Sequence, residues 1–209
     1  MTLAQSLLGF TALAAVVAVT PGLDTVLVLR QALRAGRRTA FAAAAGIGLG
    51  ALLWGIAAAA GIAALFVASE VAYSVLRWAG VAFLVYLAWS YLRAAVRGDV
   101  THADLASGAV DSAREAFVKG LLTDLLNPKM AVFYLTVLPL FLPAGIPPVL
   151  AGAVLAGVHV LVAFAWFTVV ILGAHAVRGF LTSRRGARVI DGAAGTAMLG
   201  FGLVLGLER

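Results

Sequence analysis

Two acidic residues and one lysine stand in stretches of sequence that are otherwise apolar. Asp24 belongs to "TPGLDT", and both Asp124 and Lys129 belong to "TDLLNPK". A carboxylate buried among apolar groups can bind an ammonium group, load a proton or neutralise a nearby lysine. These residue types therefore indicate binding of a zwitterion, exchange of a proton or a fixed Asp–Lys ion pair, and the sequence leaves these three roles open.

A proline interrupts each of these two stretches. Pro21 and Pro128 have no N–H, so the carbonyls of Val17 and Asp124 lose their helical partners. Unpaired backbone groups are costly in lipid, and breaks of this kind persist only where they face protein or a watery cavity. The freed carbonyls can bind a cation, and the N–H groups of the half-helix beyond each break can bind an anion. A pair of interrupted spans in corresponding halves of a chain is typical of a transporter's binding site.

His159 lies near the middle of another apolar stretch. Because histidine titrates near neutral pH, His159 could relay protons, or it could hydrogen-bond a neighbouring helix as a neutral ring. Asp124 is the second candidate for such a relay. His102 and His175 fall in polar segments and are expected at the surface. The chain has no Cys, its three His form no metal-ligand spacing and no catalytic motif is present, so we expect no metal, no cofactor and no enzyme activity.

Composition indicates that lipid surrounds the elements that carry these residues. The chain has 209 residues, of which 63% are hydrophobic and 11% are charged, whereas about a quarter of an ordinary globular domain is charged. A bilayer is crossed by about 20 apolar residues, and continuous runs rich in Ala, Leu and Gly favour helices over barrel strands. We therefore predict six transmembrane helices, at 6–29, 39–67, 71–92, 117–142, 149–173 and 190–207.

Positive charges are distributed unevenly between these stretches. Arg and Lys cluster after the first, third and fifth stretches, and the gaps after the second and fourth hold none. This pattern places the basic gaps in the cytoplasm and both termini outside. The polar segment 93–116 is then a cytoplasmic linker between two three-helix units, 1–92 and 117–209, which must insert in opposite orientations and so form an inverted repeat. Asp24 and Asp124 are expected at similar depth, but depth does not show whether they face one cavity.

Three regions resemble a known family. Residues 20–50 and 117–142 are similar to the two signature regions of the LysE/RhtB family of amino-acid exporters, and "WAGVAFLVYLAWSYLRAA" resembles that family's third helix. Leu23 replaces a second proline that many members carry, and Asp124 replaces a frequent asparagine. The resemblance implies substrate or ion binding at the matching motif positions, namely Thr20, Pro21, Gly22, Asp24, Asn127, Pro128 and Lys129.

The family also implies the partners of the protein. Members are bacterial inner-membrane carriers that export amino acids such as lysine, arginine, homoserine, threonine or leucine, driven by an inward proton or cation gradient. We accordingly expect an alternating-access exporter whose partners are an amino acid, a coupling proton or cation and the lipid bilayer, with no nucleic acid and with formation of a homo-oligomer left open.

Two other classes of function stay open at this point. One is export of inorganic ions, which the wider superfamily is thought to include, although the lack of Cys and of a His cluster argues against soft metals. The other is a membrane assembly subunit that transports nothing, which would have no need for two interrupted helices.

Overall fold

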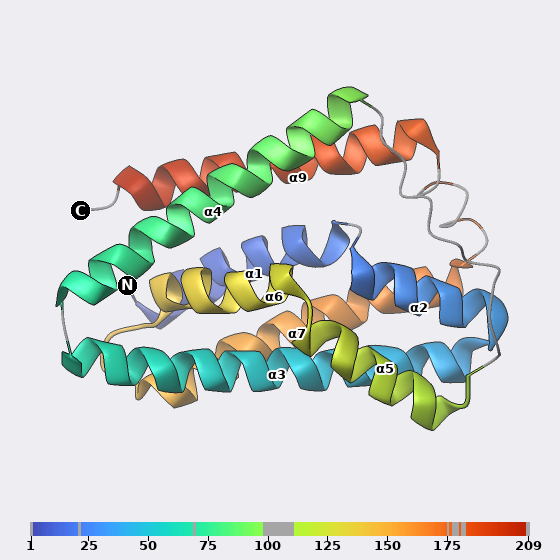
Figure 1. Ribbon diagram of the computed structural model, residues 1–209, viewed down its shortest axis with the longest axis horizontal. Coiled ribbons are helices and arrows are strands. Elements are labelled where there is room, and N and C mark those ends of the chain that lie inside the picture. Colours follow the sequence, from blue (N-terminus) through green and yellow to red (C-terminus); the bar gives the residue numbers. More distant parts are fainter. Residues whose placement is uncertain are drawn as a thin grey trace.

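The computed structural model describes residues 2–20, 22–68, 70–97, 111–174, 176, 180 and 183–207. Every regular element within these residues is helical, as predicted, and no strand occurs among them. Figure 1 shows the helices as a bundle of roughly parallel and antiparallel rods. His102 and His175 lie outside the described residues.

The first predicted span is two helices rather than one. Helix α1 (Leu3–Val19) begins at a capping box formed by Thr2 and Gln5. Helix α2 (Leu23–Arg34) follows, and its axis is bent by 55° from that of α1. Thr20 and Gly22, which flank the break, both have extended backbone conformations. The predicted interruption is therefore present, although Pro21 itself lies outside the described residues.

The fourth predicted span is broken in the same manner. Helix α5 (Ala113–Leu125) ends before Asn127, and helix α6 (Pro128–Val132) continues into a π-helix, η1 (Phe133–Val137), and a 3-10 turn, η2 (Leu138–Phe141). The two halves are bent by 54°. Pro128 occupies the first position of α6, where a missing N–H costs nothing.

Four further helices are long and mostly straight: α3 (Arg37–Ala68), α4 (Glu70–Arg97), α7 (Pro148–Leu172) and α9 (Arg184–Leu207). Their bounds follow the predicted spans within a few residues, except that α9 starts at Arg184 rather than at 190. The linker predicted at 93–116 is shorter than expected, because α4 runs to Arg97 and α5 begins at Ala113. Residues 98–110 of that linker lie outside the described residues.

Length and hydropathy single out part of this set as membrane spans. Among the described residues, Arg37–Gly61 and Pro148–Leu172 are each long and apolar enough to span a bilayer. The bent pairs α1–α2 and α5–η2 qualify only as pairs, each as a broken span or a re-entrant loop. The membrane character predicted for these elements is therefore supported. That α4 and α9 also cross the bilayer, and that the two halves form an inverted repeat, stay predictions.

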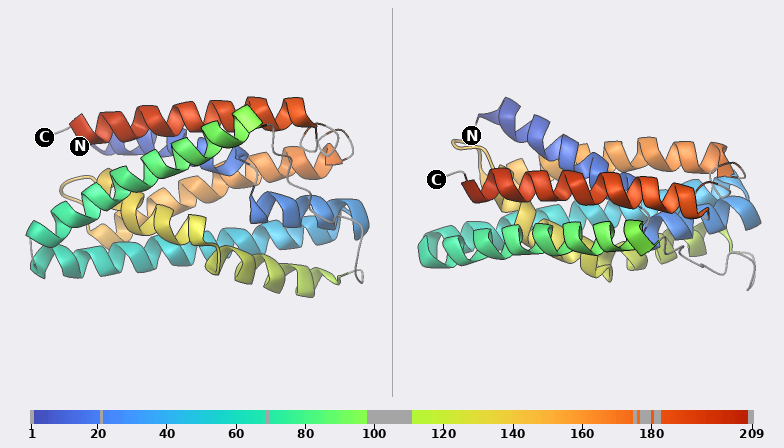
Figure 2. Two further views of the ribbon diagram at one scale, coloured as in Figure 1. Left: turned by 45° about the horizontal axis from the view of Figure 1, so that its top comes forward. Right: turned by 90° about the horizontal axis from the view of Figure 1, so that it is seen from above.

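The helices are arranged so that the two breaks face each other. Helix α3 packs along α5 and α7, while α4 and α9 pair with each other and meet the other helices mainly through α1 and η1. Figures 1 and 2 show that α1 begins and α9 ends at the same end of the molecule, and that the α2–α3 turn lies at the opposite end. This placement is consistent with the prediction that both termini lie on the opposite side of the membrane from the basic gap after the first span.

Glycine allows α3 and α5 to approach closely. A Cβ added at Gly46 would lie 2.0 Å from the carbonyl oxygen of Phe117, and one added at Gly120 would lie 2.1 Å from the carbonyl oxygen of Ala43. These distances are far below van der Waals contact, so no side chain fits between the two backbones. Small residues at a crossing are typical of membrane helix pairs, and here they set the position of the second break against α3.

Candidate functional site

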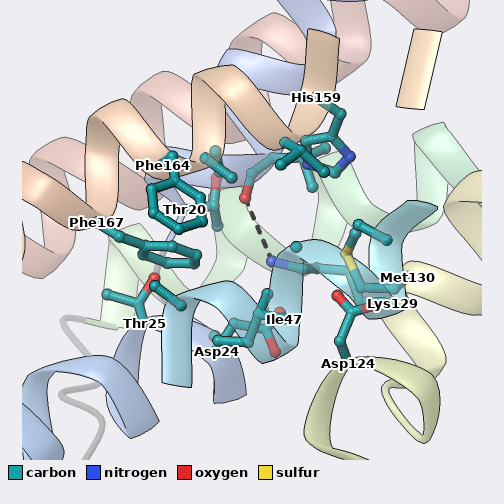
Figure 3. A pocket seen from close by; sticks show the side chains of 18 residues that line it. Thr20, Asp24, Thr25, Ile47, Asp124, Lys129, Met130, His159, Phe164 and Phe167 are labelled. Atoms are coloured by element: carbon teal, nitrogen blue, oxygen red, sulfur yellow. Dashed lines mark hydrogen bonds between the residues drawn. The ribbon is translucent and has the colours of Figure 1, made fainter. Parts of the chain in front are cut away.

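The two helix breaks line one cavity together with α3 and α7 (Figure 3). Its volume is about 30 Å³. A cavity of about 10–15 Å³ already admits a water molecule, whereas pockets for small organic ligands measure roughly 300–1,000 Å³. The cavity is therefore large enough for water but must widen before it can hold an amino acid. Its polar and ionisable lining residues are Thr20, Asp24, Thr25, Asp124, Lys129 and His159.

Asp24 joins the two breaks. It lies in the first turn of α2, where a carboxylate is favoured by the helix dipole, and it is buried. The side-chain amide of Asn127, from the other break, donates a hydrogen bond of 3.0 Å to its Oδ2 atom. Its Oδ1 atom has no hydrogen-bond partner among the described residues. One acceptor of Asp24 therefore holds the two breaks together and the other is unpaired.

Asp124 is fully buried at the end of α5. Neither of its carboxylate oxygens has a hydrogen-bond partner within the described part of the chain. Gly50 of α3 lies directly against it, because a Cβ at that position would be 2.6 Å from Oδ2 and 2.9 Å from the Cβ of Asp124. A buried carboxylate is costly without a partner, so this group is poised to receive a proton, an ammonium or another cation.

The ammonium of Lys129 does not pair with either acid. It donates a hydrogen bond of 3.3 Å to the carbonyl of Val17, shown as a dashed line in Figure 3. It interacts electrostatically with both Asp24 and Asp124, but the described residues contain no Lys129–Asp ion pair within 4.0 Å. The fixed Asp–Lys ion pair, one of the roles that the sequence left open, is thus absent among the described residues. The Lys129 ammonium instead donates to the Val17 carbonyl, which Pro21 was predicted to leave without a helical donor.

The other predicted free carbonyl is already used. The carbonyl of Asp124 accepts hydrogen bonds from the backbone N–H of Asn127 at 3.1 Å and from the indole of Trp54 at 3.3 Å. The prediction that this carbonyl is open for a cation is therefore wrong. The tight turn that ends α5 folds the chain back onto it, and α3 supplies the second donor.

His159 forms a buried pair with Tyr134. The Tyr134 hydroxyl and the His159 Nδ1 atom are 2.8 Å apart, and the rings of Phe10 and Phe133 pack around the histidine. His159 lines the cavity from α7, and Tyr134 comes from the π-helix η1. Of the two roles that the sequence left open for His159, the hydrogen bond to a neighbouring helix is present. The proton relay stays a prediction.

Comparison with known proteins shows the family of the chain. Residues 15–209 match the LysE type translocator family. The chain belongs to that family. It is 28% identical over 194 residues to the threonine efflux protein of Escherichia coli (strain K12), which covers 91% of this chain and 92% of that protein.

Two further relatives of this LysE type translocator are described only as uncharacterized membrane proteins. YrhP of Bacillus subtilis (strain 168) is 26% identical over 98% of this chain and 100% of its own length. A protein of Haemophilus influenzae is 30% identical over 89% of both chains. No solved structure matches the chain. The resemblance seen in the sequence is confirmed, and the chain is a membrane protein of a translocator family.

Most of the residues predicted for the site lie together in this translocator. Thr20, Gly22, Asp24, Asp124 and Lys129 line the cavity, and Asn127 bonds Asp24. Gly22 leaves room for the lysine, since a Cβ there would lie 3.1 Å from the Lys129 Nζ atom. Pro21 lies outside the described residues, and for Pro128 only the backbone is described.

Sequence reasoning missed the residues that α3 and α7 contribute. Gly50 and Trp54 of α3 contact Asp124, and Phe164 and Phe167 of α7 form an apolar wall of the cavity (Figure 3). The spacing of Gly50 and Trp54 by four residues places them on one face of a helix. The spacing could therefore have shown that Gly50 and Trp54 share a helix face, but nothing in the sequence shows which helix packs against that face.

A second cluster outside the cavity links α2 to α5. Asp111, just before α5, accepts a hydrogen bond of 2.6 Å from the Gln31 side chain of α2 and pairs with Lys119 of α5. The hydrogen bond from Lys119, followed by that from Gln31, lowers the pKa of Asp111 from its ordinary value of 3.8. This cluster ties α2 to α5, the two half-helices that adjoin the basic gaps.

Proposed function

We propose that this LysE type translocator exports amino acids, or close derivatives of them, from the cytoplasm across the bacterial inner membrane. The observation that carries the proposal is a set of three buried carboxylate oxygens, on Asp24 and Asp124, that have no hydrogen-bond partner among the described residues and share one cavity with the Lys129 ammonium. Acceptors and a cation side by side suit a ligand that carries both charges. The relatives named threonine efflux proteins support an amino acid as that ligand.

The charged groups match the two ends of a zwitterion. An α-ammonium group has three N–H donors, and three carboxylate oxygens of the cavity have no donor from the described protein groups. The substrate carboxylate would pair with the Lys129 ammonium. Charge-assisted hydrogen bonds of this kind contribute about 1.5–3 kcal/mol each, so loss of one would weaken binding roughly 10–100-fold.

The net charge of the site supplies a reason for ion coupling. Two ionised carboxylates and one ammonium leave a formal charge of −1, and a bound zwitterion does not change it. A proton or another cation would neutralise this charge of −1. Asp124 is the better acceptor because neither of its carboxylate oxygens has a hydrogen-bond partner in the described part of the chain. His159, which also lines the cavity, is the second candidate for a proton relay. Export would then be an antiport in which an inward proton or cation replaces the outgoing amino acid.

Transport would take place by alternating access. The cavity is too small for an amino acid, so one side must open, and the bends between α1 and α2 and between α5 and α6 are the natural hinges. In this proposal six helices form an inverted repeat, 1–92 and 117–209, with both termini outside and the basic gaps in the cytoplasm.

Uptake into inside-out membrane vesicles tests the proposal. Vesicles from cells that overproduce the protein should accumulate one or more of the twenty amino acids when their interior is acidified, and a protonophore should abolish the accumulation. Vesicles from cells without the protein are the control. Accumulation of no amino acid, or of a divalent metal ion instead, would contradict the proposed function.

A further inference from the structure

Lys129 occupies a place that suits the ammonium of a substrate. Its Nζ atom donates to the carbonyl of Val17, which stands four residues before Pro21 and therefore receives no helical N–H. Figure 3 shows this amine reaching across the cavity, with the carboxylates of Asp24 and Asp124 nearby. The site thus already contains a primary ammonium among a backbone acceptor and two acids.

The lysine head and the α-ammonium of an amino acid are chemically alike. Each is a compact unit charge with three N–H donors and no acceptor. The cavity measures about 30 Å³, which is room for water-sized groups, and its Val17 carbonyl already accepts a hydrogen bond from Lys129. A Cβ added at Gly22 would lie 3.1 Å from the Lys129 Nζ atom, so the lysine head uses space that the glycine leaves open. A substrate ammonium that binds the Val17 carbonyl therefore competes with Lys129 for it.

We infer that Lys129 is an internal stand-in for the substrate ammonium and that it makes the substrate's carboxylate obligatory for recognition. The inference rests on the proposed function and adds a specificity rule to it. A displaced lysine carries its charge with it, and in a buried cavity that charge needs an anion beyond the two carboxylates that bind the substrate ammonium. An amino acid brings this anion in its own carboxylate, and Lys129 can pair with it on leaving Val17.

A primary amine without a carboxylate lacks this compensation. Its ammonium would take up the three carboxylate oxygens that have no donor from the described protein groups, and the displaced Lys129 ammonium would then lack an acceptor of its own, which is costly for a buried charge. The rule therefore separates amino acids from the amines that carry the same side chain. Removal of the lysine should relax the rule, because the Val17 carbonyl and both acids are then open to any ammonium.

Ligand binding to the purified protein in lipid nanodiscs tests the inference. The probes are two pairs with matching side chains, L-threonine with isopropanolamine and L-leucine with isopentylamine. The wild type should bind the better amino acid at least about tenfold more tightly than its amine, a difference of about 1.4 kcal/mol. In Lys129→Gln the affinity for the amine should rise at least about tenfold while that for the amino acid falls. Lys119→Gln, which changes the chain's other lysine on the surface, should behave like the wild type.

Each alternative gives a different result. If Lys129 only binds the substrate carboxylate, Lys129→Gln weakens the amino acid and leaves the amine unchanged, which overturns the inference. Equal binding of amine and amino acid by the wild type overturns it as well, and this measurement needs no variant to fold. Lys129→Met is a second variant that removes the ammonium. If the wild type binds neither amino acid and also fails the vesicle test across all twenty, the proposed function falls with the inference.

Discussion

At the scale of single residues, the site depends on the space that glycine leaves for a carboxylate. Gly50→Ala would bring a Cβ to within 3.1 Å of the Cβ, Cγ and Oδ2 atoms of Asp124, so the whole acidic side chain has to move. We expect amino-acid uptake to fall by at least about tenfold, the cost of losing one charge-assisted contact, in vesicles with wild-type amounts of protein. Gly61→Ala, also in α3 but with open space around it, should keep wild-type uptake, and equal uptake by the two variants would contradict this role of Gly50.

The sequence predicted the charged half of the site for a physical reason. Two prolines beside two acids in apolar stretches can be recognised without a structure, because each residue type is costly in lipid. The partner of each group could not be read in this way. Lys129 bonds the Val17 carbonyl and Trp54 bonds that of Asp124, and both contacts depend on which helices pack together. Phe164 and Phe167 gave no signal, since aromatic residues are equally at home facing lipid or a cavity.

At the scale of elements, the close approach of α3 and α5 positions the second break. Gly46→Ala would place a Cβ 2.0 Å from a backbone carbonyl of α5, and a backbone cannot turn aside as a side chain can. We expect a loss of about 1–3 kcal/mol in the free energy of unfolding, as for overpacked cores. Thermal unfolding in detergent checks this, with Gly61→Ala as the control. An unchanged melting temperature for Gly46→Ala would show that the helices are not in such close contact.

The link between α2 and α5 predicts a dependence of stability on pH. Because the pKa of Asp111 is lowered in the folded protein, its contribution is present above its ordinary value of 3.8 and is lost as the pH falls through the lowered pKa. Lys119 is half exposed, so the contribution should be at most about 1 kcal/mol. Asp111→Asn should therefore melt below the wild type at pH 6, and the difference should shrink on acidification below pH 4. A difference that is constant over this range would contradict a charge-dependent link.

The bends are the elements that sequence reasoning described best. The interruption of both spans was expected from proline alone, and bends of 55° and 54° are found at these positions. The π-helix η1 that follows α6 was not expected, because its residues "FYLTV" differ in no obvious way from an ordinary apolar helix. Whether a helix turn takes up the extra residue of a π-helix depends on how the helix packs. Here the π-helix turn places Tyr134 opposite His159.

At the scale of the whole molecule, the membrane topology is open to direct measurement. The chain contains no Cys, so a single introduced Cys is labelled without background. Ala144→Cys, in the exposed turn before α7, should react with a membrane-impermeant maleimide in intact cells. Arg114→Cys, exposed at the start of α5, should react only after the membrane is permeabilised. The reverse pattern would place the basic gaps outside and contradict the predicted orientation.

In the proposed mechanism, the two buried acids of one cavity carry the amino acid and its coupling proton. Gradient-driven uptake into proteoliposomes, measured for the wild type, Asp24→Asn and Asp124→Asn with the amino acid found in vesicles, tests this role of the two acids. Each variant should lose at least about tenfold in uptake, and any uptake that Asp124→Asn retains should no longer respond to the proton gradient. If both variants keep wild-type uptake and wild-type proton dependence, these acids do not have the role assigned to them.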